Sequence, residues 1–347
     1  MGPVADLRLP IPRTADPMDA PAVRWGILAP GWIASTFASG VRDHTRQRLH
    51  AVGSRSLDRA QDFAREFGID TAYGSYEELV ADPDIDVVYV ASPHSEHREH
   101  ALMAIEAGKA VLVEKAFARS AAEAREVFDA AAGAGVFAME AMWTRFLPQQ
   151  DVVRQCLEQG LLGTVHTVMA DHGQLLYPEG PQRLRDPALA GGALLDLGVY
   201  PVSFAHFALG SIASVSATGL LTDAGVDAQD SITVRSASDA LGVLGTTMLT
   251  KTPTVATVCG TGARLDIGGD FYTTGVPVRL LTPDGELQDE YRYPVAGHRL
   301  DFEAAEVARC ITAGLRESPL LPWAETLAVM GTMDEVRRQV GVRYPGE

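Results

Sequence analysis

Two short segments hold the side chains best suited to move a proton. Glu114-Lys115 directly follows the apolar run 110–113, and Asp196 and Tyr200 stand in the glycine-rich run 191–200. A tyrosine hydroxyl has a reference pKa of about 10, and a nearby ammonium lowers it. If 191–200 is helical, Asp196 and Tyr200 lie on one face. We predict that Tyr200 exchanges an alcohol proton, Lys115 holds the substrate oxygen, and Asp196 orients the substrate or the tyrosine.

Each of these residues also has a purely structural interpretation. Glu114 and Lys115 could form a surface ion pair, and Tyr200 could be a buried tyrosine on a helix that Asp196 caps. Lysine usage argues against the ion pair, because only three of the 29 Lys and Arg residues are lysines, namely Lys109, Lys115 and Lys251. Lysine can change its protonation state in a protein and arginine cannot, so a retained lysine can mark a position where arginine would fail.

The first apolar run, 23–29, leads into a turn typical of dinucleotide binding. A Gly-x-Gly-x-x-Gly/Ala turn between a strand and a helix brings backbone N–H groups close to a pyrophosphate. Its positions are occupied here by Ala29, Gly31 and Ala34, so alanine replaces the first glycine. The alternative is an ordinary strand-to-helix turn. The residues predicted to contact the cofactor at this turn are Ala29, Gly31, Trp32 and Ile33.

The tip of the second expected strand favours NADP over NAD. NAD enzymes usually place an acid there, on the ribose 2′-hydroxyl. This chain has Gly53-Ser54-Arg55-Ser56 instead. A carboxylate would repel a 2′-phosphate, whereas Ser54 and Arg55 could donate hydrogen bonds to it. The alternative is that Arg55 is a solvated surface residue.

Further cofactor contacts are expected at the carboxyl ends of the next strands, where doubly wound sheets bind their ligands. The strand 86–91 ends in Ser92-Pro93-His94, followed by His97, and the strand 110–113 ends in the Glu114-Lys115 pair. We predict that the cofactor contacts Ser92, Pro93, His94, His97, Glu114 and Lys115.

The elements around these residues predict the fold. Strands alternate with helices up to residue 142, including a helix over 121–132 that Gly133 would end, and this rhythm indicates a parallel sheet. After residue 142, β-rich runs separated by Gly, Asp and Pro predominate. The predicted class is α/β, with an N-terminal Rossmann dinucleotide-binding domain and a C-terminal α+β domain with a large open mixed or antiparallel sheet. The predicted divisions are a loose tail at 1–22, the dinucleotide-binding domain at 23–142, and a substrate-binding and oligomerisation domain at 143–347.

Composition excludes several partners. The formal net charge of −16 disfavours nucleic acid, whose binding depends on Lys and Arg neutralising phosphates, and disfavours an anionic membrane. Residues 1–22 lack the long apolar run of a secretory signal, and no apolar stretch of about 20 residues predicts a membrane span. The three cysteines have no metal-ligand spacing, so we predict no metal site and a cytoplasmic location.

Taken together, these motifs resemble the glucose-fructose oxidoreductase/inositol dehydrogenase family. The resemblance runs from about residue 23 to 210 and rests on the Gly31-Ile33-Ala34 turn, the Ser92-Pro93-His97 tip, Glu114-Lys115, and the 191–200 segment. The run Met142 to Pro148 and the Ser54-Arg55 tip are similar to the dimeric dihydrodiol dehydrogenases and the NADP-dependent xylose dehydrogenases.

The resemblance carries implications for the site. It implies that Lys115 and Tyr200 are the catalytic pair, and that the open C-terminal sheet forms a homodimer or homotetramer interface. Trp143, Arg145 and Phe146 could line the substrate pocket or serve only as packing between domains. Departures from the family pattern are Ala29, His94 in place of the common Asn, Ala116 in place of the usual Pro, and Ala193 in place of the third glycine.

The expected function is NADP-dependent hydride transfer to or from a CH–OH or carbonyl carbon of a sugar, a polyol or a trans-dihydrodiol. Two alternatives within the enzymes are a keto-sugar reductase of the anhydrofructose type and an aldose–ketose oxidoreductase. A third alternative, of another class, is a regulator that binds NADP without turnover. Glu114-Lys115 and Tyr200 argue against it, because a sensor does not need an acid–base pair.

Overall fold

The computed structural model describes residues 7–347 and divides into two compact units, each discontinuous in sequence. The parallel-sheet unit comprises Ala15–Phe146 and Arg299–Met330. The mixed-sheet unit comprises 7–14, Leu147–His298 and Gly331–Glu347. A late segment of the chain thus belongs to the same unit as the N-terminal α/β region.

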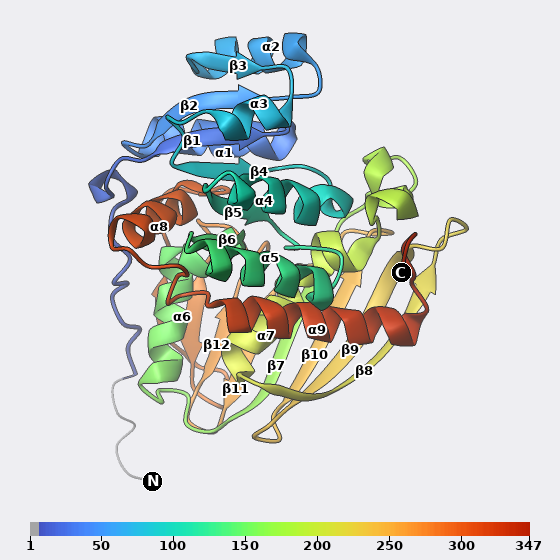
Figure 1. Cartoon of the computed structure of the whole chain (residues 1–347). Helices are drawn as coiled ribbons and strands as arrows, with labels where there is room; N and C mark the ends of the chain where they lie inside the picture. Colours follow the sequence, from blue (N-terminus) through green and yellow to red (C-terminus); the bar gives the residue numbers. More distant parts are fainter. Residues whose placement is uncertain (1–6) are drawn as a thin grey trace. The chain divides into compact units, whose positions relative to one another are not determined.

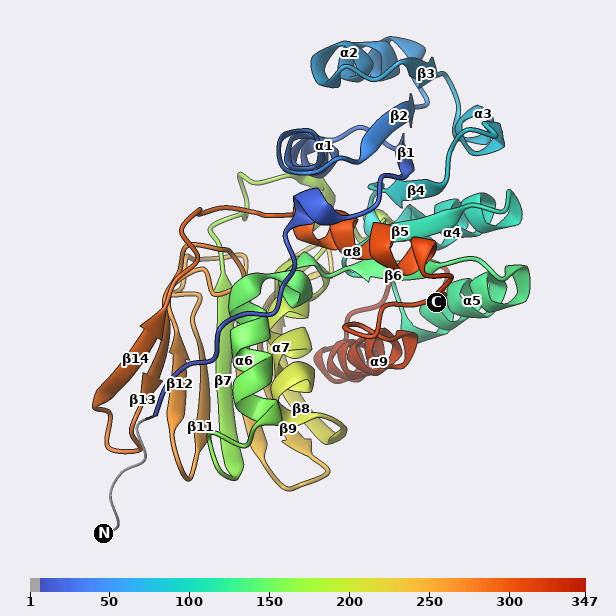
Figure 2. The same ribbon diagram turned by 90° about the vertical axis from the view of Figure 1, so that its left-hand side faces the viewer.

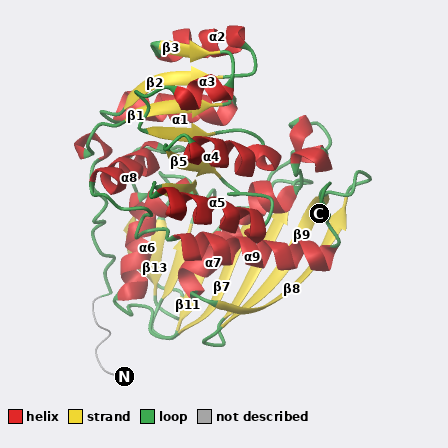
Figure 3. Ribbon diagram, in the orientation of Figure 1, coloured by secondary structure: helices red, strands yellow, loops and turns green. Residues whose placement is uncertain are grey.

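In the described residues, the parallel-sheet unit has one six-stranded sheet in the order β3-β2-β1-β4-β5-β6, with every neighbouring pair parallel (Figures 1 and 3). This is the strand order of the doubly wound dinucleotide-binding fold, so the predicted class of this half is confirmed. Its central strands are buried, as expected when helices cover both faces of a sheet. The strands are β1 (Arg24–Leu28), β2 (Arg48–Gly53), β3 (Thr71–Tyr73), β4 (Val87–Val90), β5 (Ala110–Glu114) and β6 (Ala138–Ala141).

Three helices of this unit begin where a serine side chain accepts a backbone N–H group, the usual N-cap arrangement. Ser56, Ser75 and Ser120 cap α2, α3 and α5 in this way. The prediction that Gly133 ends α5 is wrong, since the helix continues to Ala134 and ends at Gly135, whose φ is 71°. The helices are α1 (Trp32–His44), α2 (Leu57–Phe67), α3 (Tyr76–Ala81), α4 (His97–Glu106), α5 (Ala121–Ala134) and α8 (Asp301–Thr312).

Residues from the end of the chain complete the core of this unit. The helix α9 (Trp323–Val340) begins with an indole that donates to the carbonyl of Ala138 at 2.8 Å and stacks on Phe128 at 5.3 Å between ring centroids. The hydroxyl of Thr326 donates to Glu140 at 3.1 Å. β6 is therefore held in part by a segment that follows it by more than 180 positions.

The mixed-sheet unit contains, among its described residues, an eight-stranded sheet in the order β14-β13-β12-β11-β7-β10-β9-β8. β7 and β10 pair in parallel and the other neighbouring pairs are antiparallel, which confirms the predicted open mixed sheet. The strands are β7 (Val165–Gly173), β8 (Ile212–Leu221), β9 (Asp227–Ser236), β10 (Leu241–Thr247), β11 (Ala256–Gly260), β12 (Arg264–Ile267), β13 (Val278–Leu281) and β14 (Leu287–Tyr291).

The helices α6 (Pro148–Glu158) and α7 (Val199–Leu209) lie on one face of this sheet (Figure 2). Side chains alternate between buried and exposed along β9 and β10, as expected for a sheet packed on one face. Met169 and Val243 face each other on paired strands, and both are about half exposed. The face away from the helices thus carries exposed apolar side chains.

The prediction of a loose tail over 1–22 is wrong for residues 7–22, and residues 1–6 lie outside the described part. The guanidinium and backbone N–H of Arg13 bind the carboxylate of Asp151 on α6. The backbone N–H of Leu9 donates to Asp289 on β14 at 3.0 Å. A short 3₁₀ turn follows at Pro17–Asp19, capped by Asp16. Long-range side-chain contacts, which composition does not reveal, hold the segment in place.

A 23-residue segment, Pro187–Leu209, is long and apolar enough to cross a membrane by length and composition. However, 89% of its most apolar window is buried inside the protein. It contains α7, which packs on β7 and β10, and burial of this kind is typical of the core helix of a globular fold.

Candidate functional site

The turn after β1 leaves open space at the start of α1. Ala29 has a φ of 69°, in the left-handed region, and its N–H donates to the carbonyl of Gly53 at 3.1 Å. Gly31 is the N-cap of α1. A Cβ at Gly31 would meet no described atom within 4 Å. A helix N-terminus with room in front of it fits a pyrophosphate.

The substitution of the first glycine has a measurable cost. The left-handed conformation costs an L-residue about 1–2 kcal/mol, and glycine loses about 0.5–1 kcal/mol more backbone entropy on folding. We therefore expect Ala29→Gly to raise the free energy of unfolding by about 0.5–1 kcal/mol, measured by denaturant titration. Ala34→Gly, inside α1, is the matched control and should lower it by at least about 1 kcal/mol. A loss of stability in Ala29→Gly would contradict the strain.

Two arginines lie near the tip of β2. Arg55 is exposed and hydrogen-bonds the hydroxyl of Tyr76. Arg59, in the first turn of α2, is also exposed and donates to the carbonyl of Pro30, in the loop after β1, at 3.4 Å. Burial raises the pKa of Tyr76, and both guanidinium groups oppose that rise. Arg59 was not singled out in the sequence, although its place four residues after Arg55 was an available signal.

Ser54 contributes to this tip differently. Its side chain is buried, and its hydroxyl accepts the backbone N–H of Ser56 at 3.3 Å. The two residues expected to contact the 2′-phosphate therefore differ. The exposed side chain of Arg55 is accessible to a ligand, whereas the buried hydroxyl of Ser54 stabilises the loop.

The histidines after β4 contact the loop that carries Lys115. His97 is fully buried, with one ring nitrogen 2.9 Å from the carbonyl of Ala116 and the other 2.8 Å from that of Ser92. A ring nitrogen of His94 lies 3.2 Å from the carbonyl of Lys115. Burial lowers the pKa of His97 to about 4, although both carbonyl contacts oppose that shift. The structure thus brings the predicted residues after β4 and β5 together, with Pro93 half-buried between them.

Glu114 ends β5 in a buried position and receives two hydrogen bonds. The hydroxyl of Tyr89 donates to one carboxylate oxygen, and the backbone N–H of Lys115 donates to the other at 3.2 Å. The side chain of Lys115 is half-buried, and its peptide bond to Ala116 is cis. Burial raises the pKa of the neighbouring Glu140 to about 7, with a smaller contribution from Glu114.

The three residues predicted to line a substrate pocket lie inside the parallel-sheet unit. Trp143, Arg145 and Phe146 form a 3₁₀ turn, η3 (Trp143–Phe146), and each is buried. The guanidinium of Arg145 pairs with Glu325 at 2.7 Å. These contacts support the packing interpretation for Arg145 in particular, because its charge is balanced within its own unit.

In the mixed-sheet unit, Asp196 lies in a π turn, η6 (Leu194–Gly198), and Tyr200 in the first turn of α7, which follows at once. The expectation of a regular helix over 191–200 is therefore corrected. A π turn takes more residues per turn than an α-helix, so four positions no longer amount to one full turn. Asp196 forms an ion pair with Arg183 at 2.9 Å.

Tyr200 is surrounded by rings that the sequence did not reveal. Its ring centroid lies 5.1 Å from that of His172 at the end of β7 and 4.8 Å from that of Tyr272. The amide nitrogen of Gln174 lies 3.0 Å from a ring nitrogen of His172 and 3.4 Å from the hydroxyl of Tyr272. An amide nitrogen only donates, so the histidine nitrogen accepts. These residues are far apart in sequence and carry no common motif.

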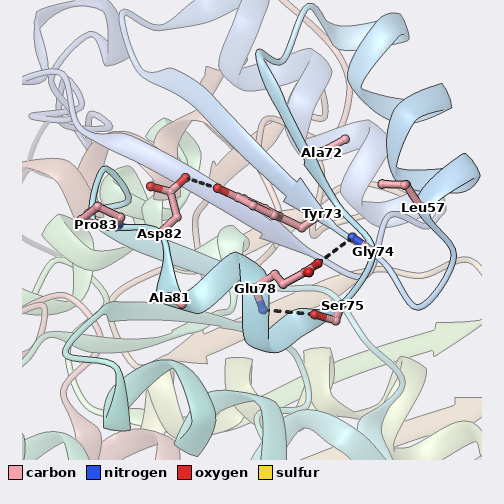
Figure 4. Close-up of a pocket in the computed structure, with 9 residues that line it drawn as sticks. All are labelled: Leu57, Ala72, Tyr73, Gly74, Ser75, Glu78, Ala81, Asp82 and Pro83. Atoms are coloured by element: carbon pink, nitrogen blue, oxygen red, sulfur yellow. Dashed lines mark hydrogen bonds between the residues drawn. The ribbon is translucent and has the colours of Figure 1, made fainter.

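A pocket of about 750 Å³ lies away from these residues, between β3 and α3 (Figure 4). Its polar groups bind one another, since the hydroxyl of Tyr73 donates to Asp82 and the backbone N–H of Gly74 donates to Glu78. Ligand atoms of His50, Asp82 and Asp84 lie within 4.8 Å of one another nearby. Asp82 already accepts the backbone N–H of Asp84 and the hydroxyl of Tyr73, so its oxygens are engaged without a metal ion.

Comparisons with known proteins match both units. The model described as "Oxidoreductase family, NAD-binding Rossmann fold" covers residues 23–142, and that described as "GFO/IDH/MocA C-terminal domain" covers 151–266. A trans-1,2-dihydrobenzene-1,2-diol dehydrogenase from Mus musculus is 36% identical over 93% of this chain and 98% of its own length. A D-xylose 1-dehydrogenase (NADP(+)) from Hypocrea jecorina is 37% identical over 93% of each chain. The solved aldose-aldose oxidoreductase from Caulobacter crescentus has a TM-score of 0.82 at 24% identity, covering 92% of this chain and 98% of its own, which shows the shared fold.

Proposed function

Because this chain belongs to the glucose-fructose oxidoreductase/inositol dehydrogenase (Gfo/Idh/MocA) family of oxidoreductases, we propose that it moves a hydride between NADP and a CH–OH or carbonyl carbon of a sugar, a polyol or a trans-dihydrodiol. The observation that carries this proposal is the pair of exposed arginines beside the open turn at Gly31. The dihydrodiol dehydrogenase and xylose dehydrogenase relatives support the substrate class.

The open turn would hold the pyrophosphate, and Arg55 with Arg59 would hold the 2′-phosphate. NADP, when bound, supplies or accepts the hydride, while the protein places and polarises the substrate. Tyr200 exchanges the proton of the substrate hydroxyl. Lys115 donates a hydrogen bond to the same oxygen and stabilises its negative charge as it develops. Asp196, neutralised by Arg183, orients the substrate or the tyrosine.

The first experiment is a titration of the purified protein with NADP and with NAD, followed by turnover assays. Aldoses, inositols, trans-dihydrodiols and keto-sugars form the panel. Tighter binding of NADP, with turnover of at least one member, is the expected result, and turnover of keto-sugars alone would assign the reductase alternative. Binding without turnover on the entire panel would favour the regulator, and a protein that binds neither dinucleotide would overturn the proposal.

The cofactor preference should depend on Arg55. Arg55→Glu replaces a donor to the 2′-phosphate with a repelling carboxylate, and a hydrogen bond to a charged group is worth about 1.5–3 kcal/mol. We therefore expect the affinity for NADP relative to NAD to fall by about 10- to 100-fold, measured by fluorescence titration of both dinucleotides. Arg65→Glu, an equal charge change at the far end of α2, is the control and should leave the ratio unchanged. An unchanged ratio in Arg55→Glu would remove Arg55 from the cofactor site.

The open face of the mixed sheet is the proposed interface of a homodimer or homotetramer. Its exposed apolar side chains include Met169, Leu241 and Val243, from the paired strands β7 and β10, and apolar patches of this kind often mark association surfaces. Val243→Asp should convert the oligomer to a 37.1-kDa monomer in light scattering after gel filtration. Leu315→Asp, an equally exposed leucine in the other unit, should not. A wild-type protein that is already monomeric would refute this interface.

The cellular location is proposed on separate grounds. Cys156, Cys259 and Cys310 are free thiols, and burial raises the pKa of Cys156 and of Cys310 to about 12, so they are unreactive at neutral pH. Free thiols are typical of a reducing compartment, which supports the cytoplasm.

A further inference from the structure

Two groups from distant parts of the mixed-sheet unit fix the start of the segment that carries Asp196 and Tyr200. The hydroxyl of Tyr344, near the end of the chain, donates to the carbonyl of Gly191 at 2.9 Å. The backbone N–H of Leu194, the first residue of the π turn, donates to a carboxylate oxygen of Asp227 at 2.5 Å. Tyr344 and Asp227 are both buried. Tyr344 and Asp227 therefore fix the backbone at Gly191 and at Leu194, both of which precede Asp196.

Asp227 does not act alone, because it hydrogen-bonds the buried side chain of Asp230 on the same strand. Two carboxyl groups can share a hydrogen bond only when one of them carries a proton. Burial, and then the charge of Asp227, raises the pKa of Asp230 to about 9. Burial also raises the pKa of Asp227, whereas the N–H of Leu194 lowers it. At neutral pH, Asp230 therefore holds the proton and donates it, and Asp227 accepts from both Asp230 and Leu194.

The surrounding backbone is shaped to admit this pair. Gly192 has a φ of 121°, and a Cβ there would lie 2.1 Å from Oδ1 of Asp227. A Cβ at Gly219, opposite on β8, would lie 2.2 Å from Oδ1 of Asp230. Within residues 7–347, neither oxygen has a hydrogen-bond partner when both carboxyls are ionised, whereas a proton on Asp230 allows it to bond Asp227. The carboxyls occupy a space that two glycines leave open, and they satisfy each other inside it.

The end of the chain holds Tyr344 in place. The guanidinium of Arg337 lies over the tyrosine ring, 4.8 Å from its centroid, and donates to both carboxylate oxygens of Glu347. Glu347 also accepts the backbone N–H of Tyr344 at 3.1 Å. The last residues of the chain thus form a closed set of contacts that aims one hydroxyl at Gly191.

We propose that Asp227 and Tyr344 are positioning residues for the reaction, since they fix the start of the Leu194–Gly198 turn and, through it, the side chains of Asp196 and Tyr200. The inference rests on the role proposed for Tyr200. Neither residue needs to touch the substrate. Their contribution is to keep the turn in one arrangement, because small displacements of catalytic groups lower turnover strongly.

The acid pair makes the arrangement dependent on pH. A carboxyl whose pKa is raised by folding contributes stability at low pH and loses that contribution as pH rises through its folded pKa. Above about pH 9, Asp230 loses its proton, and two adjacent carboxylates repel each other. The charged and titratable groups that face the pair are Tyr344, Arg337 and Glu347 from the end of the chain, with Arg183 and Asp196 beside the turn.

The test compares Asp227→Ala with Asp227→Asn and Tyr344→Phe in the full-length protein. The alanine leaves the N–H of Leu194 without an acceptor, so kcat should fall at least tenfold while the Kd for NADP stays within twofold. The asparagine keeps an acceptor oxygen and should recover most of the loss. Tyr344→Phe removes one hydroxyl and should lower kcat severalfold. Ser236→Ala is the control. It also removes a buried side-chain acceptor on β9, which receives the backbone N–H of Ala240 in the following turn, and it should lower stability without changing kcat.

Asp230→Asn supplies the pH readout. The amide donates to Asp227 at every pH, so the variant should retain activity at pH 7 and keep it to higher pH than the wild type. An alkaline limit identical to that of the wild type would overturn the role of the pair. This comparison separates Asp230 from other groups that titrate in the alkaline range, because only Asp230 has changed.

Hydrogen exchange gives an answer that does not depend on turnover. The amide of Leu194 should exchange at least tenfold faster in Asp227→Ala and faster in Tyr344→Phe, but not in Ser236→Ala. If the wild type turns over no substrate, the proposed function fails, and exchange still decides whether these residues hold the turn. Unchanged kcat in Tyr344→Phe and Asp227→Ala, in an active protein, would overturn the inference, and so would unchanged exchange at Leu194. Should the alanine variant fail to fold, Tyr344→Phe and Asp230→Asn carry the test.

Discussion

Turnover should fall by about 100- to 10,000-fold when Tyr200 is replaced by phenylalanine, the range typical for loss of a general acid–base group. The ring contacts with His172 and Tyr272 remain in this variant, because only the hydroxyl is removed. The Kd for NADP should therefore stay close to that of the wild type. Stopped-flow measurement of NADPH formation at several pH values tests both statements, since the lost group should also remove a limb from the pH profile.

Tyr272→Phe is the matched control for this experiment. It removes a hydroxyl from the neighbouring ring, which accepts the amide of Gln174 at 3.4 Å, and should lower kcat by less than about tenfold, since the loss of a neutral hydrogen bond costs about 0.5–1.5 kcal/mol. Equal losses in the two variants would mean that Tyr200 has no special role. Near-normal turnover in Tyr200→Phe would remove it from the chemistry altogether.

Lys115→Met should lower kcat by about 100- to 1,000-fold, the loss seen when one donor to a developing oxyanion is removed. Methionine keeps an apolar chain of similar length, so the loop held by His94 and His97 should be preserved. If Lys115 and Tyr200 act on the same oxygen, the double variant should lose much less than the product of the single losses, because residues that act as a unit are not additive. Multiplicative losses would place the two residues in separate steps.

Lys109→Met separates the loss of a lysine from the loss of a catalytic group. The ammonium of Lys109 is buried and donates to the carbonyls of Asp82 and Ile85, so its removal takes away two buried hydrogen bonds. We expect a lower melting temperature and unchanged kcat, the reverse of the result for Lys115→Met. Loss of turnover in both variants would show that instability, and not chemistry, explains the effect.

The sequence revealed those parts of the fold that repeat a local pattern. The strands β1, β4 and β5 are short, largely apolar runs, and the matched family model confirms the dinucleotide-binding fold that they indicate. β3 was not predicted, because its three half-buried residues carry no such run. Gly133 did not end α5, since a helix interior tolerates glycine at a cost of about 1 kcal/mol and the alanines around it favour helix.

The candidate site divides in the same way. Gly31, Arg55, Lys115 and Tyr200 could be selected because each follows a strand or belongs to a recognisable motif, and their roles stay predictions. His172 and Tyr272 could not, because their positions depend on contacts between distant segments, whereas Arg59 was missed although it lies four residues after Arg55. The π turn belongs with these, since the acceptor of its first N–H is Asp227, which lies 33 positions further along the chain.

The parallel-sheet unit consists of two segments that are far apart in the sequence, so the ribosome produces them at different times. Its N-terminal part ends at Phe146, but Trp323 and Thr326, which bind β6, are synthesised only after nearly the entire mixed-sheet unit. Until Thr326 has been synthesised, the carboxylate of Glu140 therefore lacks the hydroxyl that donates to it in the folded protein. The parallel-sheet unit is therefore complete only when the chain has been synthesised to Met330, long after its six strands have emerged.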